Sequence, residues 1–281
     1  MNDIWKRKDS TYLHIEKWQR LNDRLIAGFT TKQGGVSKGR YHSLNVGFHV
    51  HDSRADVTMN RNRIASKIHF PIDSWVCGEQ VHQTNIQLVS EADKGKGAAD
   101  NSSAIKGVDG LITNRPGILC TAFFADCVPL FFYDPSTSFI GIAHAGWRGT
   151  VNQMAKHMVE AIQAQGSDPA NLLVTIGPCI SEEYYEVDEK VVNQIPEKYK
   201  KNAVVPNGKQ RFLLDLKQLH VDILLQAGVL RNNIDVTNYC TYRDETLFFS
   251  HRRDHGKTGR MLGFIGFLHD YRRGENWKQW M

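Results

Sequence analysis

The sequence predicts an α+β protein with mixed β-sheets. Candidate strands follow one another in clusters instead of alternating with helices, and only three segments have clear helical periodicity. Strict alternation would have favoured a doubly wound parallel sheet. No Pro-rich or Gly/Ser-rich linker divides the 281 residues, and one large core is within reach at this length. We therefore expect a single domain over residues 1–281.

The candidate strands are short apolar or alternating runs bounded by turn residues. In chain order they are residues 25–29, 75–77, 86–89, 109–113, 118–123, 128–133, 139–144, 172–176, 235–238 and 261–267. Between two of them, residues 91–107 are rich in Gly, Ala, Ser, Asp and Lys, which is typical of a mobile surface loop.

Three segments have the spacing of amphipathic helices, namely residues 57–68, 150–165 and 215–227. In the second, Val151, Met154 and Met158 fall on one face. Thr150 is a suitable N-cap for it, and Gly166 supplies its end.

Composition and charge exclude several classes of function. The net charge of +5 is mild, and the basic residues form no dense stripe, so we expect no nucleic-acid partner. The first ten residues lack the apolar core of a signal peptide, and no run of about 18 apolar residues predicts a membrane span. Five scattered cysteines do not resemble a disulfide framework. These features favour a cytoplasmic protein with at least one free or metal-bound thiol.

Three segments at the ends of apolar runs, residues 80–83, 125–127 and 144–150, carry side chains that bind metals. A set of one thiolate and two imidazoles, from Cys127, His82 and His144, suits zinc, and three protein ligands leave a position for water or substrate. The separations, 127 − 82 = 45 and 144 − 127 = 17, match no zinc-finger spacing. A buried structural cysteine and hydrogen-bonded core histidines are the alternative.

Other polar segments suggest an anion site. Residues 144–150 run from a strand into the predicted helix, and a helix start with Arg148 beside it attracts phosphate. The loop at residues 34–47 offers backbone amides, Arg40, Ser43 and Asn45, but lacks the spacing of a P-loop. The basic segment 250–260 is suited to an anionic substrate. An ordinary capped helix and a solvated charged face are the alternatives.

Taken together, these segments resemble the YfiH/YlmD family of laccase-domain-containing proteins, most closely its members from bacilli. The resemblance covers nearly the whole chain. It rests on Ser-Leu-Asn-Val-Gly at 43–47, Asn-Arg at 60–61, Gln-Val-His at 80–82, Val-Asp-Gly at 108–110, Ala-Asp-Cys at 125–127, His-Ala-Gly-Trp-Arg-Gly-Thr at 144–150, Ile-Gly-Pro-Cys-Ile at 176–180, Ser-His-Arg-Arg at 250–253 and Thr-Gly-Arg-Met at 258–261.

The resemblance implies a fold, a metal and an activity. The expected fold is a sandwich of mixed sheets with helices outside, and the expected zinc ligands are His82, Cys127 and His144. Members phosphorolyse adenosine, inosine and methylthioadenosine and deaminate adenosine, although they were first described as copper-dependent polyphenol oxidases. The expected partners are thus purine nucleosides and phosphate, with no membrane partner, and the expected protein is a monomer or a small homo-oligomer.

Roles for further residues follow from that chemistry. For deamination, zinc would activate water for attack at C6 of adenine, and Asp126 or Glu79 would shuttle the proton. For phosphorolysis, Arg148 and the helix start at Thr150 would hold phosphate, with Ser43, Asn45 and Arg61 as further substrate-binding residues.

Two other functions stay open. Cys127 and His144 are also the nucleophile and base that a metal-free thiol hydrolase needs. A copper polyphenol oxidase is the second alternative, but it needs several close His-x-His pairs, and only His49 and His51 have that spacing.

Overall fold

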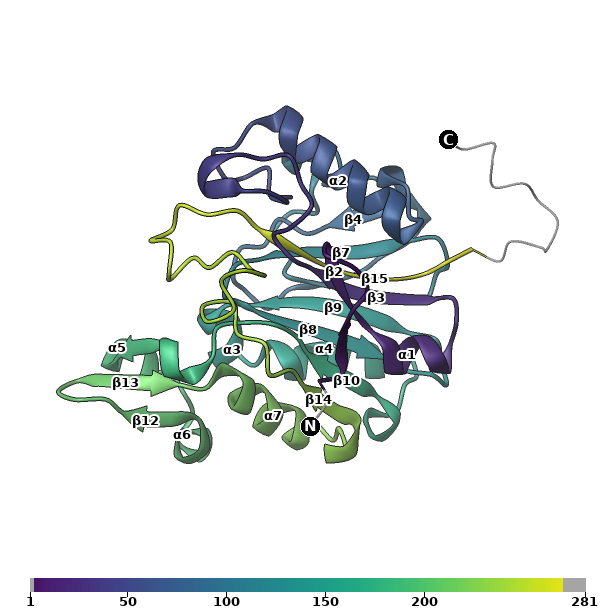
Figure 1. Cartoon of the computed structure of the whole chain (residues 1–281). Coiled ribbons are helices and arrows are strands. Elements are labelled where there is room, and N and C mark those ends of the chain that lie inside the picture. The colour runs from purple at the N-terminus through teal and green to yellow at the C-terminus, as the bar shows by residue number, and fades with distance from the viewer. Residues whose placement is uncertain (1–2, 270–281) are drawn as a thin grey trace.

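The computed structural model describes residues 3–269, and two six-stranded mixed sheets face each other at its centre (Figure 1). The first sheet has the order β1 (Trp5–Arg7), β2 (Tyr12–Ile15), β3 (Leu25–Thr30), β15 (Met261–Phe267), β7 (Leu119–Phe124) and β4 (Trp75–Cys77). The second has the order β14 (Ile234–Val236), β10 (Leu173–Ile176), β8 (Val128–Tyr133), β9 (Ile140–Ala145), β6 (Gly110–Thr113) and β5 (Ile86–Leu88). Each sheet is antiparallel except at its edges, where β4 with β7, β5 with β6 and β10 with β14 are parallel.

The central strands are buried on both faces, which explains why they are nearly continuous apolar runs. In β8, Phe131 and Tyr133 pack between the two sheets, whereas Leu130 and Phe132 face the helices outside. In β7, Phe124 points to the other sheet and Phe123 to the outer layer. Side chains of a strand alternate between faces, so every position here has an apolar partner.

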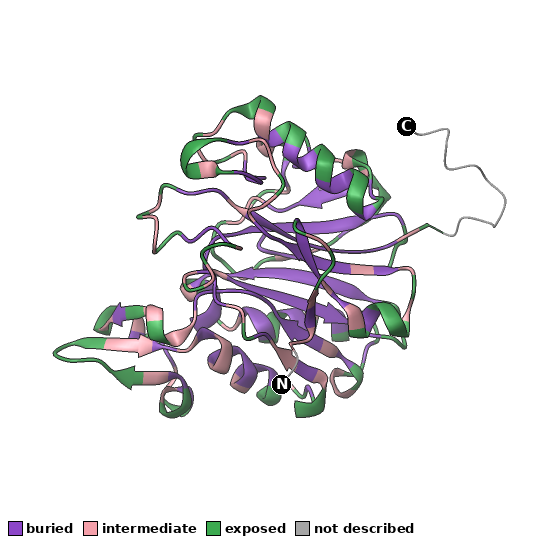
Figure 2. Cartoon of the chain, in the orientation of Figure 1, coloured by how far each residue is buried: buried purple, intermediate pink, exposed green. Residues whose placement is uncertain are grey.

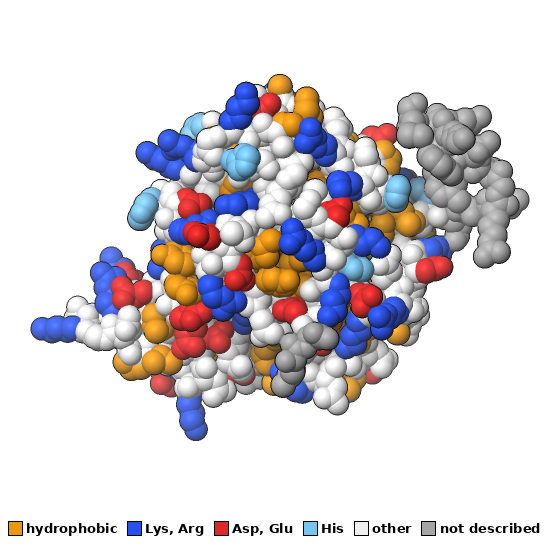
Figure 3. Space-filling model, viewed as in Figure 1, with side chains coloured by type: hydrophobic (Ala, Val, Ile, Leu, Met, Phe, Trp, Pro, Cys, Tyr) orange, Lys and Arg blue, Asp and Glu red, His pale blue; other side chains and the backbone are white. Residues whose placement is uncertain are grey.

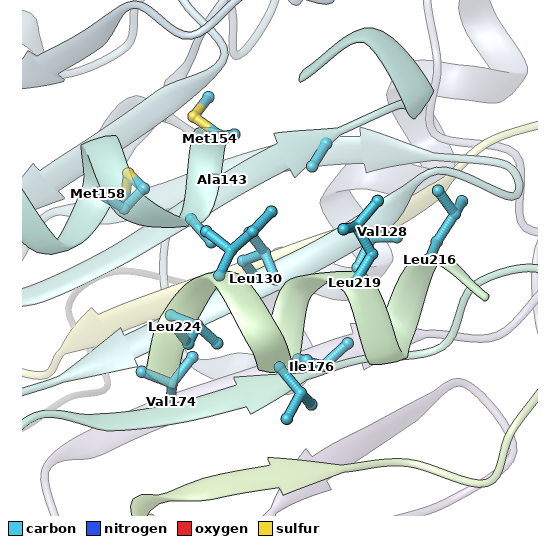
Figure 4. Close-up of a cluster of buried hydrophobic side chains, with 14 of the residues drawn as sticks. Val128, Leu130, Ala143, Met154, Met158, Val174, Ile176, Leu216, Leu219 and Leu224 are labelled. Atoms are coloured by element: carbon cyan, nitrogen blue, oxygen red, sulfur yellow. The ribbon is translucent and has the colours of Figure 1, made fainter. Parts of the chain in front are cut away.

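Helices cover both outer faces of the sandwich (Figure 1). The first sheet is covered by α2 (Arg54–Ile68), and the second by α4 (Met154–Gln163) and α7 (Leu216–Gln226). Figure 4 shows the second contact, in which Met154 and Met158 of α4 and Leu219 and Leu224 of α7 meet the strands. The shorter helices are α1 (Glu16–Leu21), α3 (Trp147–Val151), α5 (Glu189–Val192) and α6 (Glu197–Ala203).

The predicted class, an α+β single domain with sandwiched mixed sheets and outer helices, is confirmed, and all ten predicted strands are present within two residues. The helix predicted at 57–68 begins three residues earlier, after the Ser53 cap, and the one at 215–227 matches α7, which Asp215 caps. Residues 91–107 form no strand but are partly anchored, because Ala98 and Ala104 are buried.

One helix prediction was wrong. Residues 150–165 form parts of two helices, α3 and α4, separated at Gln153, whose φ of 61° lies in the left-handed region. Helix α3 begins after Gly146, so Thr150 lies within the helix and is not its N-cap. The apolar face continues across the break, and periodicity alone therefore did not reveal it.

A small third sheet was not predicted from the sequence. It consists of β11 (Glu186–Asp188), β13 (Arg211–Leu214) and β12 (Val204–Pro206), all antiparallel, and it projects at the lower left of Figure 1. Its strands are only three or four residues long and are mostly exposed or half-buried (Figure 2), so they lack the long buried runs that mark the central strands. It forms one wall of the cavity described below.

Among residues 3–269, no helix is long and apolar enough to cross a lipid bilayer. On the face seen in Figure 3, Lys and Arg side chains are interspersed with Asp and Glu and form no continuous basic stripe.

Candidate metal centre

Three predicted ligand residues, far apart in sequence, meet at one end of the sandwich. His82 lies in the loop between β4 and β5, Cys127 in the turn between β7 and β8, and His144 near the end of β9. One ligand atom from each lies within 4.8 Å of the others. The two imidazole rings are 4.8 Å apart, with an angle of 84° between their planes. The strand register of β8 and β9, which pairs Pro129 with His144, brings the turn that holds Cys127 to the same end.

A buried carboxylate, Asp109, fixes two of these ligands. Its Oδ1 accepts hydrogen bonds from the His82 amide at 3.0 Å and from Nδ1 of His144 at 2.9 Å. Its Oδ2 accepts hydrogen bonds from the amides of Val81 at 3.0 Å and Gln83 at 2.9 Å. The carboxylate thus holds the loop at residues 81–83, where His82 adopts a left-handed φ of 62°.

The bond to Asp109 sets the tautomer of His144. In the neutral imidazole, Nδ1 carries the proton that it donates to Asp109, so Nε2 is the nitrogen that is available to a metal. Burial would raise the pKa of Asp109, but His144 and the amides of Gln83 and His82 outweigh it and lower that pKa. We did not predict Asp109 as a site residue, although the Val-Asp-Gly motif at 108–110 was a signal for it.

Cys127 and His144 shift each other's pKa. Burial would raise the pKa of Cys127, but the neighbouring His144 and His82 lower it to about 6. Burial would likewise lower the pKa of His144, but the Cys127 sulfur and Asp109 raise it to about 9. At neutral pH the cysteine is therefore a thiolate, which is the form that binds metal.

The space between the ligands depends on Gly146. A Cβ atom there would lie 2.6 Å from Cδ2 of His82 and 3.2 Å from Sγ of Cys127. Zinc binds nitrogen at about 2.0–2.1 Å and sulfur at about 2.3 Å, so three ligand atoms within 4.8 Å of one another suit it after a small closure. The donor set, the oriented imidazole and the cradle at Gly146 together fit a zinc ion.

A cavity of about 800 Å³ opens onto this centre, within the range of small-molecule sites. Its walls come from the metal loops, from the start of α3, from the third sheet and from the loop at residues 251–260. The lining includes four arginines, Arg148, Arg211, Arg252 and Arg260. It also includes the aromatic residues Phe123, Trp147 and Tyr185.

The two carboxylates expected to shuttle protons both line this cavity, but they differ in burial and in their hydrogen-bond partners. Asp126 is buried and accepts hydrogen bonds from Thr241 Oγ1, Ser250 Oγ and the Arg252 amide, so it holds the loop that begins at residue 250. Glu79 is half-buried, and its pKa is lowered by the Gly107 amide and then by Lys106. Glu79 therefore keeps an ionised carboxylate at the cavity wall.

Arg148 lines the cavity as well, with its guanidinium 5.0 Å from the centre of the Trp147 ring. Two arginines that we did not single out join it. Arg252 lies over Tyr185 at 4.9 Å and donates to the Glu186 carbonyl, and Arg260 donates to the Thr258 and Gly259 carbonyls. The basic character of residues 250–260 was the sequence signal for both.

Four residues expected to bind substrate are not part of the cavity lining, and the chain itself uses their polar atoms. Ser43 stabilises the loop at 34–47 through hydrogen bonds with Gly35 and Lys32. Asn45 does so through hydrogen bonds with Asp52, Gly47 and Arg260. Arg61 is buried between the rings of Phe48 and Phe123 and donates to three carbonyls. Thr150 donates to the Gly146 carbonyl and contacts Nε2 of His220.

The fold and the site define a class: an α+β sandwich protein with a candidate metal centre of one cysteine and two histidines at one end of the sandwich. A family model described as multi-copper polyphenol oxidoreductase laccase matches residues 26–268, and this chain belongs to that family. The resemblance to YfiH/YlmD proteins is confirmed.

Individual relatives cover most of the chain. It is 44% identical to the purine nucleoside phosphorylase YlmD of Bacillus subtilis, over 90% of this chain and 94% of that one. It is 46% identical to the protein of the same name from Geobacillus stearothermophilus, over 90% of this chain and 91% of that one. The crystal structure of the Geobacillus YlmD superposes with a TM-score of 0.90 at 43% identity, over 95% of this chain and all of that one. A Bacillus licheniformis protein, YfiH, superposes over the same shares with a TM-score of 0.91 at 40% identity.

Proposed function

We propose that this protein is a zinc-dependent purine nucleoside phosphorylase that acts on adenosine, inosine and methylthioadenosine. The observation that carries the proposal is the convergence of His82, Cys127 and His144 at the floor of an arginine-lined cavity. The names of the Bacillus and Geobacillus relatives support the same activity.

His82, Cys127 and His144 would hold the zinc ion, and Asp109 would orient His144 and the His82 loop. A zinc ion in this site supplies Lewis-acid chemistry beside the bound substrate. The thiolate and two imidazoles leave room for one further ligand, as catalytic zinc sites do.

Phosphorolysis needs a phosphate held in line with the ribose C1′ atom. One phosphate oxygen forms a bond to C1′ while the bond from C1′ to N9 of the purine breaks, and the electron pair leaves with the base. We assign phosphate binding to Arg148 and Arg260, since guanidinium groups pair with phosphate oxygens through two parallel hydrogen bonds. Arg252 lies in the same wall and is held by Tyr185.

The departing purine must gain a proton or a hydrogen bond. Burial and then the charge of Cys127 raise the pKa of Tyr185, so its hydroxyl stays protonated at neutral pH. Tyr185 lines the cavity and supplies an aromatic face together with that proton. We therefore assign to Tyr185 the contact with the purine base.

Deamination of adenosine is the second reaction that we propose for this cavity. Water adds to C6 of adenine, the bond from C6 to the amino nitrogen breaks, and ammonia leaves with the proton taken from the water. Glu79 favours this reaction because it keeps an ionised carboxylate at the wall that also holds His82. Asp126 is the poorer base, since three hydrogen bonds already engage it.

The two alternatives fit the structure less well. A multicopper oxidase needs several copper sites, whereas the described residues contain one cluster of metal-binding side chains, and neither His49 nor His51 belongs to it. A thiol hydrolase has support in the neighbouring Cys127, His144 and Asp109, but that function leaves His82 beside the thiolate without a role. The five free thiols agree with the reducing cytoplasm that we propose as its location.

The test is to incubate the zinc-loaded protein with each of the three nucleosides, with and without phosphate, and to identify the products. Free base together with ribose 1-phosphate, or with methylthioribose 1-phosphate from methylthioadenosine, formed only when phosphate is present, supports phosphorolysis. Inosine formed from adenosine without phosphate supports deamination. If no nucleoside is converted by protein with a full complement of zinc, the proposal fails.

A further inference from the structure

A second hollow, of about 910 Å³, lies between the loop at residues 39–42 and the segment at residues 245–257. None of the residues that line it lines the metal cavity. The proposed phosphorylase reaction uses none of them. The lining residues are Lys32, Gly39, Arg40, His42, Glu245, Phe249, Arg253, Asp254, His255 and Lys257.

The charges in this hollow do not balance. Arg253 and Asp254 pair at 2.9 Å, and Arg253 also donates to the carbonyls of Thr241, Tyr242 and Phe248, so this pair is satisfied by the chain. The other charged residues of the lining are three cations, Lys32, Arg40 and Lys257, and one carboxylate, Glu245. Within residues 3–269, none of these three cations has a hydrogen-bond or ion-pair partner for its side chain.

Lys32 is the most informative of the three, because its position is fixed and partly buried. Its backbone amide donates to the Leu247 carbonyl, and its carbonyl accepts from the amides of Ser43 and Leu44. The residue therefore joins three segments of the chain at the hollow. Burial, and then the charge of Arg253, lowers the pKa of Lys32. The charges of Asp254 and Glu245 act in the opposite direction and do not outweigh these two effects, and neither carboxylate forms an ion pair with the Lys32 amine. A partly buried amine without a direct partner favours a bound anion.

We propose that this hollow is a binding site for a small molecule that carries two or more linked phosphate groups. Three cations from separate segments exceed what one carboxylate or one monoanion requires, and they surround a volume larger than a single phosphate. The shared chemistry is the oligophosphate, whether it comes as an inorganic chain or on a nucleoside.

The experiment is calorimetric titration of the zinc-loaded protein with inorganic triphosphate, with ADP and with orthophosphate, at low ionic strength, where charge pairing is weakly screened. We expect saturable binding of triphosphate or ADP, and at least tenfold weaker binding of orthophosphate. Lys32→Met and Lys257→Met keep the aliphatic stem and remove the charge. Each is expected to weaken binding about tenfold, and the double variant more.

Two control variants distinguish this hollow from general charge attraction and from the metal cavity. Lys201→Met removes an exposed charge on α6 and should leave the affinity unchanged. Arg148→Met alters the metal cavity and should also leave it unchanged. Thermal unfolding verifies that each variant folds, and Lys257→Met, at an exposed position, keeps the test available if Lys32→Met does not fold. The proposal is overturned if neither probe binds, if the lysine variants bind as the natural protein does, or if Arg148→Met abolishes binding.

Discussion

Asp109 and His144 are joined twice, since the Asp109 carboxylate accepts from Nδ1 of His144 at 2.9 Å and the Asp109 carbonyl accepts from the His144 amide at 2.8 Å. The same carboxylate holds the three amides around His82. One buried acid therefore positions two candidate ligands, one from a loop and one from strand β9, before any metal binds. Such preorganisation of a metal's ligands raises its affinity.

Asp109→Asn should weaken zinc binding by about 10–100-fold. The amide nitrogen that replaces one carboxylate oxygen cannot accept hydrogen bonds from Val81 and Gln83, so the His82 loop loses its anchor. Competition with a chromophoric chelator measures the affinity. Asp73→Asn, at an exposed aspartate, is the control, and equal zinc affinity in the two variants would show that Asp109 does not position the ligands.

Gly146→Ala should remove zinc binding while leaving the protein folded. Its Cβ would stand 2.6 Å from the His82 ring, inside the space between the ligands. Gly149→Ala in the same helix is the matched control, because its Cβ makes only an ordinary contact at 3.4 Å. Metal content and thermal unfolding are measured for both. A zinc-containing Gly146→Ala protein would mean that the cradle is not needed.

The Cys127 thiol of the metal-free protein should ionise with a midpoint near pH 6. Its ordinary pKa is 9.0, which burial would raise, but the neighbouring His144 and His82 lower it. The part of the ultraviolet thiolate absorbance that is lost in Cys127→Ser, recorded from about pH 5 to 10 with a chelator present, measures this midpoint. A midpoint near the ordinary value would contradict the paired charges.

Arg148→Met should raise the KM for phosphate at least tenfold, equivalent to about 1.4 kcal/mol of binding, with a smaller effect on deamination. The reason is that only phosphorolysis needs the anion. Initial rates of both reactions are measured on the same preparation, with Lys156→Met on α4 as a charge control. Equal losses in both reactions would assign Arg148 a structural role instead.

His220 should make the protein sensitive to acid. It is fully buried on α7, its Nε2 lies 3.0 Å from Thr150 Oγ1, and burial lowers its pKa to about 3. Because the unfolded chain takes up a proton near pH 6.5 and the folded chain does not, stability falls between pH 6.5 and about 3, by up to about 1.4 kcal/mol per unit. His220→Gln should lose less stability over that range in denaturant unfolding. If the free energy of unfolding of the two proteins falls equally with pH, His220 is not kept neutral in the fold.

The central strands and the convergence of His82, Cys127 and His144 could be predicted because each has a sequence signal. Strands such as β8 are buried on both faces and therefore read as unbroken apolar runs. His82, Cys127 and His144 stand at the ends of such runs, and the motifs around them carry the family resemblance.

The remainder depends on contacts between distant residues. Apart from the Val-Asp-Gly motif, nothing local distinguishes Asp109 from the other acids. Its role comes from amides 26–28 residues away and an imidazole 35 residues away. Asn45 and Arg61 are residue types that often bind phosphate, but in this fold their side chains point inward. Asn45 accepts a hydrogen bond from the Gly47 amide, and Arg61 donates to the Val46 carbonyl. The strands of the third sheet are only three or four residues long, which is too short to give a period.

Metal analysis of the purified chain tests the central claim most directly. Elemental analysis by mass spectrometry should find about one zinc per chain, held through gel filtration, and less than about a tenth of that in Cys127→Ser. A natural protein with no more zinc than Cys127→Ser, after both are offered the metal under the same conditions, would contradict the account.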